Sequence, residues 1–366
     1  MQKNTIRRRK KRSLVWHAKR LWSIPIIRIL TAAALLALLA YLMFFSGCGK
    51  QDEASGTVSE DNSSDVVSDT VSYPETSDAP ASAVVSLVFT DATDDLTDVI
   101  RSDAGIAVRV SDMTVLGGKN MTGRIYPASM TKIMTVIVAV ESGVPLDTPF
   151  TLTYDIINPY YLAGSTITGI TAGDTVTFAD LLYGAVLESG CDATEAIAIL
   201  VAGSEEAFAD RMNAKAKEIG CTETHFSNAS GMYDSENYST LGDMAIMLCY
   251  AMKNETAAAL FSAAEYTTAA TPKNSAGYTF RSTMFGRVNG DEVTGVTITA
   301  GKTGYLSETG HCLASYAVSN TGEAYVCVTV GGATRWHPVY DCRDIYGRYA
   351  SEPDTSSAPE VSLSDG

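Results

Sequence analysis

The run Tyr-Pro-Ala-Ser-Met-Thr-Lys-Ile-Met-Thr at residues 126–135 decides how this 366-residue sequence folds. Its first residues lead into Met130–Val140, an apolar segment of helical length, so we predict a helix that begins next to Ser129. Ser129 and Lys132 then share one face of the first turn, because residues three apart on a helix are neighbours. We expect the amine of Lys132 one turn beyond the hydroxyl of Ser129.

This Ser–Lys pair has the chemistry of an activated nucleophile. The helix N-terminus contributes positive potential and free N–H groups beside the hydroxyl. A lysine whose pKa is lowered by desolvation could accept the serine proton. The S-x-x-K pattern alone is a weak signal, since it arises by chance in most proteins of this size. An exposed lysine after a helix-capping serine would give the same letters.

Two more motifs could complete a site with this pair. Ser-Gly-Cys at 189–191 follows a predicted helix as a tight polar turn. Lys302-Thr303-Gly304 lies between two predicted strands. Lys302 and Thr303 offer a cation and a hydroxyl to a carboxylate, and Gly304 would let a substrate backbone approach closely.

The order S-x-x-K, S-x-x, K-T-G is that of the penicillin-recognising serine enzymes. The chain resembles the serine-type D-Ala-D-Ala carboxypeptidases, the low-molecular-mass penicillin-binding proteins of peptidase family S11. Residues 126–135 are nearly that family's P-A-S-x-T-K-[IL]-M-T. The resemblance extends over about 100–350, with further matches at 164–165, 173–174, 178–184, 212–220, 224–231, 238–245 and 301–310.

The resemblance implies a role for each motif residue. Ser129 would be the acylated nucleophile and Lys132 its general base. Ser189 would relay a proton to the nitrogen of the leaving D-Ala. Lys302 and Thr303 would bind the terminal carboxylate of the substrate and set the electrostatic field of the site.

Other positions have less certain counterparts in the family. Backbone N–H groups of Ser129 and Tyr305, the latter directly after Gly304, would form the oxyanion hole. Arg335 could assist with the carboxylate, or it could be a solvated surface arginine. Cys191 stands where the family usually has Asn, and a thiol is a poor hydrogen-bonding group. This departure leaves the balance between hydrolysis and transpeptidation open, and Cys191 as a second nucleophile is a further alternative.

The same resemblance implies the β-lactamase-like fold, an α/β (α+β) architecture with an antiparallel sheet flanked by helices plus a helical lobe. The residue patterns also predict strands towards both chain ends with helices between them, so that one sheet joins the ends. The predicted strands are 106–110, 114–117, 278–284, 295–299, 311–319 and 324–330, with short strands or loops at 166–177. The predicted helices are 130–140, 178–187, 192–201, 205–219, 240–252 and 339–349.

The N-terminus predicts export. Residues 1–28 hold ten of the 27 Lys and Arg and no acidic residue, and an apolar segment follows at 29–48. This pattern is typical of an export signal or anchor whose basic side stays in the cytoplasm. The segment ends in Phe-Ser-Gly-Cys48, which resembles a bacterial lipobox. We therefore expect the extracytoplasmic face of the bacterial cell membrane, with attachment through lipidated Cys48 or through the uncleaved segment.

The composition of the chain predicts the remaining domain boundaries and argues against a nucleic-acid partner. Residues 49–82 are rich in Ser, Asp and Glu, which predicts a disordered tether, and 351–366 resemble a disordered tail. The catalytic domain is then 83–350. Outside the basic head, 17 basic residues face 42 acidic ones, a net charge of −25. Such a surface repels a phosphate backbone, so we expect no nucleic-acid partner.

We predict no cofactor and no metal. The four His and seven Cys are widely spaced and form no metal-ligand pattern. In an exported protein the cysteines could form one or two disulfides, or they could remain buried thiols. The expected partners are the peptidoglycan pentapeptide, β-lactam antibiotics and the membrane.

The leading hypothesis is a DD-carboxypeptidase that trims D-Ala from peptidoglycan stem peptides, inhibited by β-lactams. A DD-transpeptidase on the same fold is an alternative, as is a non-catalytic penicillin-binding sensor or scaffold. A class A β-lactamase is less favoured because no glutamate lies in the expected E-x-x-[LT]-N context. Ser129, Lys132, Ser189 and Lys302 are all present, which favours an enzyme.

Overall fold

The computed structural model describes residues 85–288 and 293–351. The predicted catalytic domain is thus described almost throughout. Within these ranges no helix is long and apolar enough to cross a membrane. The segments that lie outside the described residues are the basic head 1–28, the apolar segment 29–48, the tether 49–82 and the tail beyond Ser351.

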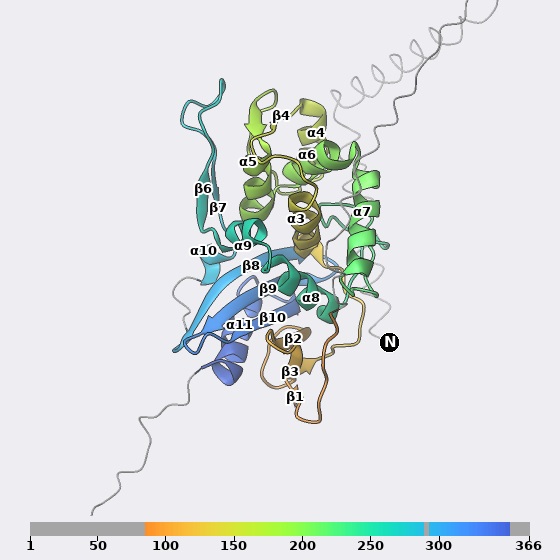
Figure 1. Ribbon diagram of the computed structural model, residues 1–366, viewed down its shortest axis with the longest axis vertical. Helices are drawn as coiled ribbons and strands as arrows, with labels where there is room; N and C mark the ends of the chain where they lie inside the picture. The colour runs from red at the N-terminus through yellow and green to blue at the C-terminus, as the bar shows by residue number, and fades with distance from the viewer. Residues whose placement is uncertain (1–84, 289–292, 352–366) are drawn as a thin grey trace, which may run out of the picture. The chain divides into compact units, whose positions relative to one another are not determined.

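One six-stranded sheet joins the two ends of the described chain, as predicted (Figure 1). Its strands are β1 (Asp94–Asp95), β2 (Ala104–Arg109), β3 (Thr114–Lys119), β8 (Val296–Leu306), β9 (Gly310–Ser319) and β10 (Ala324–Gly332). The order is β1-β3-β2-β10-β9-β8, and every neighbouring pair is antiparallel except β1 with β3. The N-terminal strands therefore pair with the C-terminal strands through β2 and β10.

The sheet is covered on both faces, because successive side chains of a strand point to opposite sides. Ile106 and Val108 of β2 belong to the core shared with the helical lobe. Ala107, between them, packs instead with α11 (His337–Tyr349) on the other face. Central strands buried on both faces are thus mostly apolar throughout, which explains why they were readily predicted.

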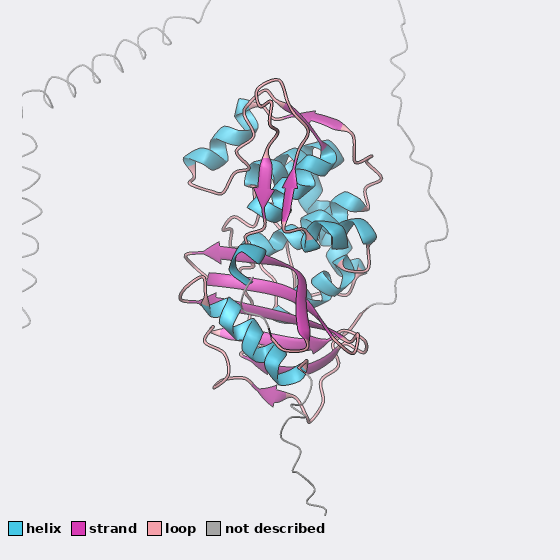
Figure 2. Cartoon of the chain, turned by 90° about the vertical axis from the view of Figure 1, so that its left-hand side faces the viewer, coloured by secondary structure: helices cyan, strands magenta, loops and turns pink. Residues whose placement is uncertain are grey.

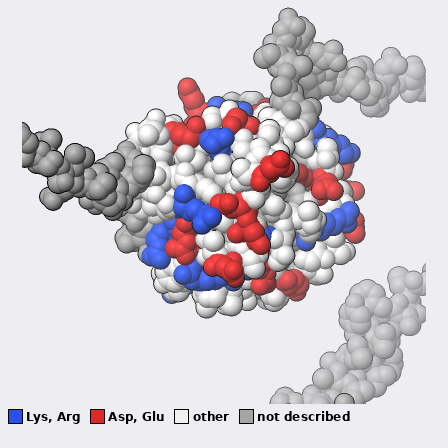
Figure 3. All heavy atoms as spheres, turned by 90° about the horizontal axis from the view of Figure 1, so that it is seen from below, with Lys and Arg blue, Asp and Glu red and all other residues white. Residues whose placement is uncertain are grey.

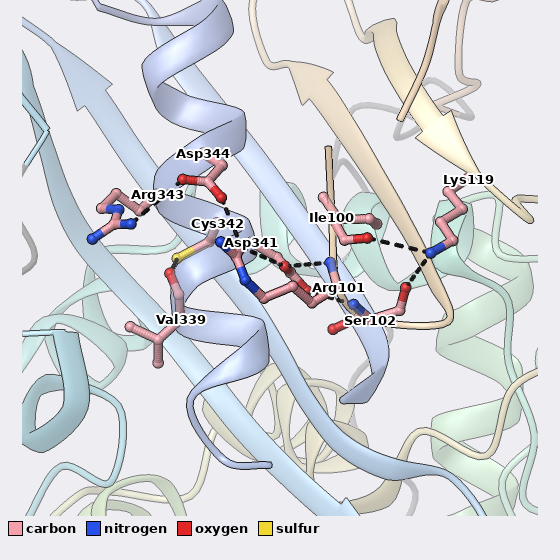
Figure 4. A network of polar contacts seen from close by, with 9 residues as sticks. All are labelled: Ile100, Arg101, Ser102, Lys119, Val339, Asp341, Cys342, Arg343 and Asp344. Carbon is pink, nitrogen blue, oxygen red and sulfur yellow. Dashed lines mark hydrogen bonds and ion pairs between the residues drawn. The ribbon is translucent and has the colours of Figure 1, made fainter. Parts of the chain in front are cut away.

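Helix α11 is attached to the loop before β2 by a buried carboxylate (Figure 4). Asp341 is fully buried and accepts hydrogen bonds from the backbone N–H groups of Arg101 at 2.7 Å and Ser102 at 2.9 Å. The Arg101 guanidinium also contacts Asp344, at 2.7 Å. These contacts join the last helix to the start of the sheet.

A helical lobe lies on the opposite face of the sheet from α11 (Figures 1 and 2). Its centre is α3, whose residues 132–139 are all buried. The lobe and its connections comprise the 3-10 turn η1 (Ala128–Thr131), α3 (Lys132–Val140), α4 (Tyr154–Leu162), α5 (Phe178–Tyr183), the π-helix η2 (Gly184–Glu188), α6 (Cys191–Ala202), α7 (Glu205–Glu218), α8 (Leu241–Ala251) and α9 (Glu255–Ser262). The short helix α10 (Phe285–Val288) packs with the core cluster that contains α11. Two short two-stranded sheets pair β4 (Pro149–Thr151) with β5 (Thr175–Thr177) and β6 (Glu265–Thr267) with β7 (Thr279–Arg281).

The structure corrects three predictions. The strand predicted over 278–284 is only β7, and the chain then turns into α10. Lys302-Thr303-Gly304 lies inside β8, because this edge strand runs without interruption to Leu306. The helix predicted over 178–187 changes from α to π geometry at Gly184.

The described cysteines are free thiols, and all six are buried. Of the two readings that the sequence left open for these six, the structure therefore agrees with buried thiols; Cys48 lies outside the described residues. On the face shown in Figure 3, Lys and Arg side chains alternate with Asp and Glu rather than gathering into one basic patch.

Candidate active site

A cavity of about 520 Å³ lies where the sheet edge meets the helical lobe. The predicted site residues that line it are Ser129, Ser189, Cys191, Thr303, Gly304, Tyr305 and Arg335. The other two, Lys132 and Lys302, are at most 1% exposed and reach the lining hydroxyl groups from behind. The structure thus brings together residues from three distant parts of the sequence.

The Ser–Lys pair has the predicted spacing in space as well as in sequence. Ser129 lies in the 3-10 turn η1, and Lys132 is the first residue of α3. Lys132 Nζ is 3.1 Å from Ser129 Oγ and donates to the carbonyl oxygen of Ser230 at 2.5 Å. Ala128 has a φ of +52°, a conformation that non-glycine residues rarely adopt and that is common beside reactive groups.

Ser189 is presented to the cavity by an unusual helix end. The π-helix η2 leads into Ser189, whose φ of +64° is left-handed. Both features store strain and are frequent at functional sites. Lys302 Nζ donates to Ser189 Oγ at 2.9 Å and to the carbonyl oxygen of Thr303 at 3.1 Å.

The charge of Lys132 acts on the pKa of the buried amine of Lys302. Burial lowers the pKa of Lys302 well below its usual value, and the positive charge of Lys132 lowers it further. Cys191, the first residue of α6, lies between the motifs, with Sγ 3.7 Å from Lys132 Nζ.

Strand β8 forms the wall opposite the nucleophile. A Cβ atom at Gly304 would lie 3.1 Å from Ala128 Cβ and 3.2 Å from the Pro127 carbonyl oxygen. Glycine at this position therefore lets β8 pack closely against the turn that carries Ser129. The close approach of a substrate backbone, expected from the sequence, would be a second reason for glycine here. Tyr305 follows at the mouth of the cavity, 59% exposed.

The sequence reasoning missed part of the lining. Ser230 and Gly231 lie inside the matched run 224–231, but no role was assigned to them. Gly231 has a φ of +78°, and a Cβ atom there would lie 1.9 Å from the Ala128 carbonyl oxygen. Only glycine fits, and this fit places the Ser230 carbonyl against Lys132. The place of Gly231 at the end of the matched run 224–231 is the signal that could have been used.

Thr283, Arg287 and His311 also line the cavity and were not predicted. Thr283 Oγ1 lies 2.8 Å from Thr303 Oγ1. The ring of His311 packs against that of Tyr305, with centroids 4.5 Å apart. No local pattern marks these residues. His311 reaches the site through the pairing of β9 with β8, and Thr283 and Arg287 reach it through the turn and helix α10 between β7 and β8. Among the described residues, no cluster of three or more His, Cys, Asp or Glu could hold a metal ion.

Comparisons with known proteins agree with this geometry. The family model of peptidase S11, D-alanyl-D-alanine carboxypeptidase, matches residues 90–334. The chain is 39% identical over 145 residues to D-alanyl-D-alanine carboxypeptidase DacF of Bacillus subtilis, covering 38% of this chain and 36% of that protein. It is 33% identical over 182 residues to the D-alanyl-D-alanine carboxypeptidase of Streptomyces sp. strain K15, covering 48% of this chain and 62% of that one.

The fold has the same relatives. The crystal structure of the Streptomyces K15 DD-transpeptidase superposes with a TM-score of 0.61 at 28% identity, covering 68% of this chain and 97% of that structure. The aligned region spans about a third of the DacF protein and just under two thirds of the curated K15 protein.

Proposed function

The chain belongs to the peptidase S11 family of D-alanyl-D-alanine carboxypeptidases, and from this membership we propose that it removes the terminal D-Ala from peptidoglycan stem peptides through an acyl-enzyme. One observation carries the proposal. Ser129 Oγ lies 3.1 Å from the buried amine of Lys132, in a cavity that also holds the Ser189 hydroxyl bound to Lys302. These are a nucleophile, a base and a proton relay.

In the acylation step, Lys132 accepts the Ser129 proton while Oγ attacks the carbonyl carbon of the penultimate D-Ala. The carbonyl oxygen gains negative charge, and the backbone N–H groups of Ser129 and Tyr305 are the proposed donors to it. The approach of Gly304 to the Ser129 turn supports this assignment, since it brings the end of β8 beside the Ser129 backbone nitrogen.

In the same step the peptide bond breaks and the leaving D-Ala nitrogen takes up a proton. Ser189, held by its hydrogen bond from Lys302, relays to that nitrogen the proton that Lys132 took from Ser129, so Lys132 is a free base again for the next step. The terminal carboxylate of the leaving residue lies against Thr303 and Arg335. Water then attacks the acyl-enzyme, releasing the shortened peptide and restoring Ser129.

A DD-transpeptidase is the second candidate, favoured by one observation. Cys191 occupies the position where an amide side chain would orient the acyl group and the acceptor, and its sulfur contacts Lys132. An amine in place of water would then complete the reaction. β-Lactam antibiotics would acylate Ser129 in either case.

The experiment that tests the proposal is incubation of the full-length chain with a pentapeptide ending in D-Ala-D-Ala, with and without an acceptor amine. Release of D-Ala without acceptor supports the carboxypeptidase. A cross-linked product that replaces the hydrolysed one supports the transpeptidase. If D-Ala is released under neither condition, the proposed activity is wrong.

We also propose that the enzyme acts outside the cell membrane, attached by its N-terminus. The basic residues ahead of an apolar segment support this location. Two modes of attachment differ in mass at the N-terminus. A lipoprotein would begin at a lipidated Cys48 and lose its lipid in Cys48→Ala, whereas an anchored chain would keep Met1 in both forms. A chain found only in the cytoplasm would contradict the proposal.

A further inference from the structure

Two arginines that line the cavity have no acidic partner among the residues that the structure describes. Arg287 comes from α10 and Arg335 from the segment between β10 and α11, and both line the cavity. Neither guanidinium forms a hydrogen bond or an ion pair with any residue in the described part of the chain. Arg335 lies over the ring of Trp336, 5.2 Å from its centroid.

This arrangement is electrostatically unfavourable in the free protein. Burial lowers the pKa of Arg287, and the positive charge of Arg335 lowers it further, so the two guanidinium groups are close enough to repel each other. Arginine nevertheless stays protonated, since its pKa is far above neutrality. A partly buried and an exposed positive charge that repel each other are both stabilised when an anion lies between them.

The neighbouring polar groups do not neutralise these charges. Burial lowers the pKa of His311, and Arg287 and Arg335 lower it further, so the imidazole is neutral at pH 7; its Nδ1 atom is buried without a hydrogen-bond partner. Glu188 also lines the cavity, but one of its carboxylate oxygens accepts the backbone N–H of Arg281 at 2.8 Å, and it forms no ion pair with either arginine among the described residues.

Two arginine side chains remain available in the cavity, and one of them is enough to bind the terminal carboxylate of the substrate. Lys132 and Lys302 are engaged inside the protein, by Ser129 and Ser189 respectively. A single arginine can bind a carboxylate through two parallel hydrogen bonds. If Arg335 and Thr303 hold the terminal carboxylate, the guanidinium of Arg287 is left for a second negative group.

The position of Arg287 indicates which part of the substrate carries that group. Arg287 lies four residues after Thr283, in the short helix that follows the turn carrying that threonine, and Thr283 Oγ1 contacts Thr303 Oγ1 at 2.8 Å. Thr303 is the hydroxyl assigned to the terminal carboxylate, so Arg287 lies on the side of the leaving residue. Gly164, Ser165 and Cys191 line other parts of the same cavity wall.

We propose that Arg287 and Arg335 form a subsite for a leaving residue that carries its own side-chain carboxylate, so that the enzyme also removes terminal D-Glu or D-Asp. The inference rests on the proposed carboxypeptidase function and concerns its specificity. The reaction is the same hydrolysis: one peptide bond is cleaved, and one water is consumed. Arg287 binds the side-chain carboxylate, and it takes no part in proton transfer.

The test compares three otherwise identical peptides ending in D-Ala-D-Glu, D-Ala-D-Gln and D-Ala-D-Ala, with the full-length chain and two variants. Arg287→Gln removes the proposed contact. Arg281→Gln is the matched control, because that exposed arginine on the same segment pairs with Glu265 outside the cavity. We expect the wild-type chain to prefer D-Glu over D-Gln, and Arg287→Gln to lower kcat/KM for D-Glu by about tenfold, mainly through KM. Arg281→Gln should leave all three rates unchanged.

Three results would overturn the inference. One is absence of any preference for D-Glu over the isosteric D-Gln. Another is an equal loss for all three peptides in Arg287→Gln, since that would assign Arg287 to the shared terminal carboxylate or to structure. The third is no loss at all. Labelled penicillin separates this failure from failure of the proposed function: a chain that is acylated and releases D-Ala but ignores D-Glu disproves only the subsite.

Discussion

The inner and outer positive charges of the cavity differ in how they are satisfied. Lys132 and Lys302 are buried, and each donates to a serine oxygen and to a backbone carbonyl oxygen. Arg287 and Arg335 are accessible from the cavity and have no such partners in the described chain. The inner pair is therefore organised before substrate arrives, as proton-transfer groups must be. The outer pair lacks only an anion, which the substrate brings.

Removing a buried lysine should have the largest effect on activity, and it tests whether the inner pair serves proton transfer. Lys132→Ala should lower the rate of Ser129 acylation by at least about 1,000-fold, because the hydroxyl loses its general base. The measurement is the rate of labelling by a fluorescent penicillin. Lys217→Ala, an exposed position on α7, is the control and should react normally. A Lys132→Ala variant that is acylated at the control rate would show that another group activates Ser129.

A second variant leaves the Lys132 amine in place and displaces the Ser230 carbonyl oxygen to which that amine donates. Gly231→Ala places a Cβ atom on the Ala128 carbonyl oxygen, so the loop that carries the Ser230 carbonyl must shift. We expect acylation to fall by about 100-fold, since small displacements of a catalytic group have effects of that order.

Gly143→Ala is the matched control for backbone strain. Gly143 also has a positive φ, +76°, but a Cβ atom there meets nothing within 4 Å. It should cost about 1 kcal/mol of unfolding free energy and leave the acylation rate intact. Equal rates in the two variants would mean that the fit at Gly231 does not position Lys132.

The smallest expected effect is a pH dependence of stability due to Lys302. Its pKa is lowered in the folded protein, so at pH values below 10.5 the unfolded chain binds more protons at this residue. The contribution of Lys302 to the unfolding free energy must therefore rise with pH between its lowered folded-state pKa and about 10.5, by at most about 1.4 kcal/mol per pH unit. Above that pH both states are neutral and the contribution is constant.

Lys302→Met should remove this slope. The difference in unfolding free energy between wild type and variant, measured by denaturant titration at several pH values, should change in favour of the wild type as the pH approaches 10.5. Arg335→Met should show no such change, because arginine remains charged throughout. Parallel pH curves for wild type and Lys302→Met would contradict the depressed pKa.

The sequence predicts those helices and strands that depend on the order of neighbouring residues, and it does not predict those that depend on tertiary packing. The central strands and the helices 192–201, 205–219 and 240–252 were predicted because apolar periodicity is a local property. Helices α4 and α9 were not, since α4 contains Pro159 and α9 is short and rich in alanine. The π-helix before Ser189 depends on tertiary packing and has no sequence signature.

The residues of the site also differ in whether a local sequence motif marks them. Ser129, Lys132, Ser189 and Lys302 are recognisable from motif spacing, and the structure brings them together. Arg287 has no motif around it; it reaches the cavity because α10 packs beside the edge strand β8. Its importance follows from the lack of an acidic partner within 85–288 and 293–351, and a missing contact cannot be read from sequence.

The central claim, that Ser129 is the nucleophile activated by buried lysine, is tested most directly by the intact mass of the full-length chain after incubation with benzylpenicillin. We predict that wild type gains one penicilloyl group, that peptide mapping locates it at Ser129, and that Ser129→Ala gains none. A wild type whose mass does not change, or a Ser129→Ala variant that gains the same mass, would contradict the account.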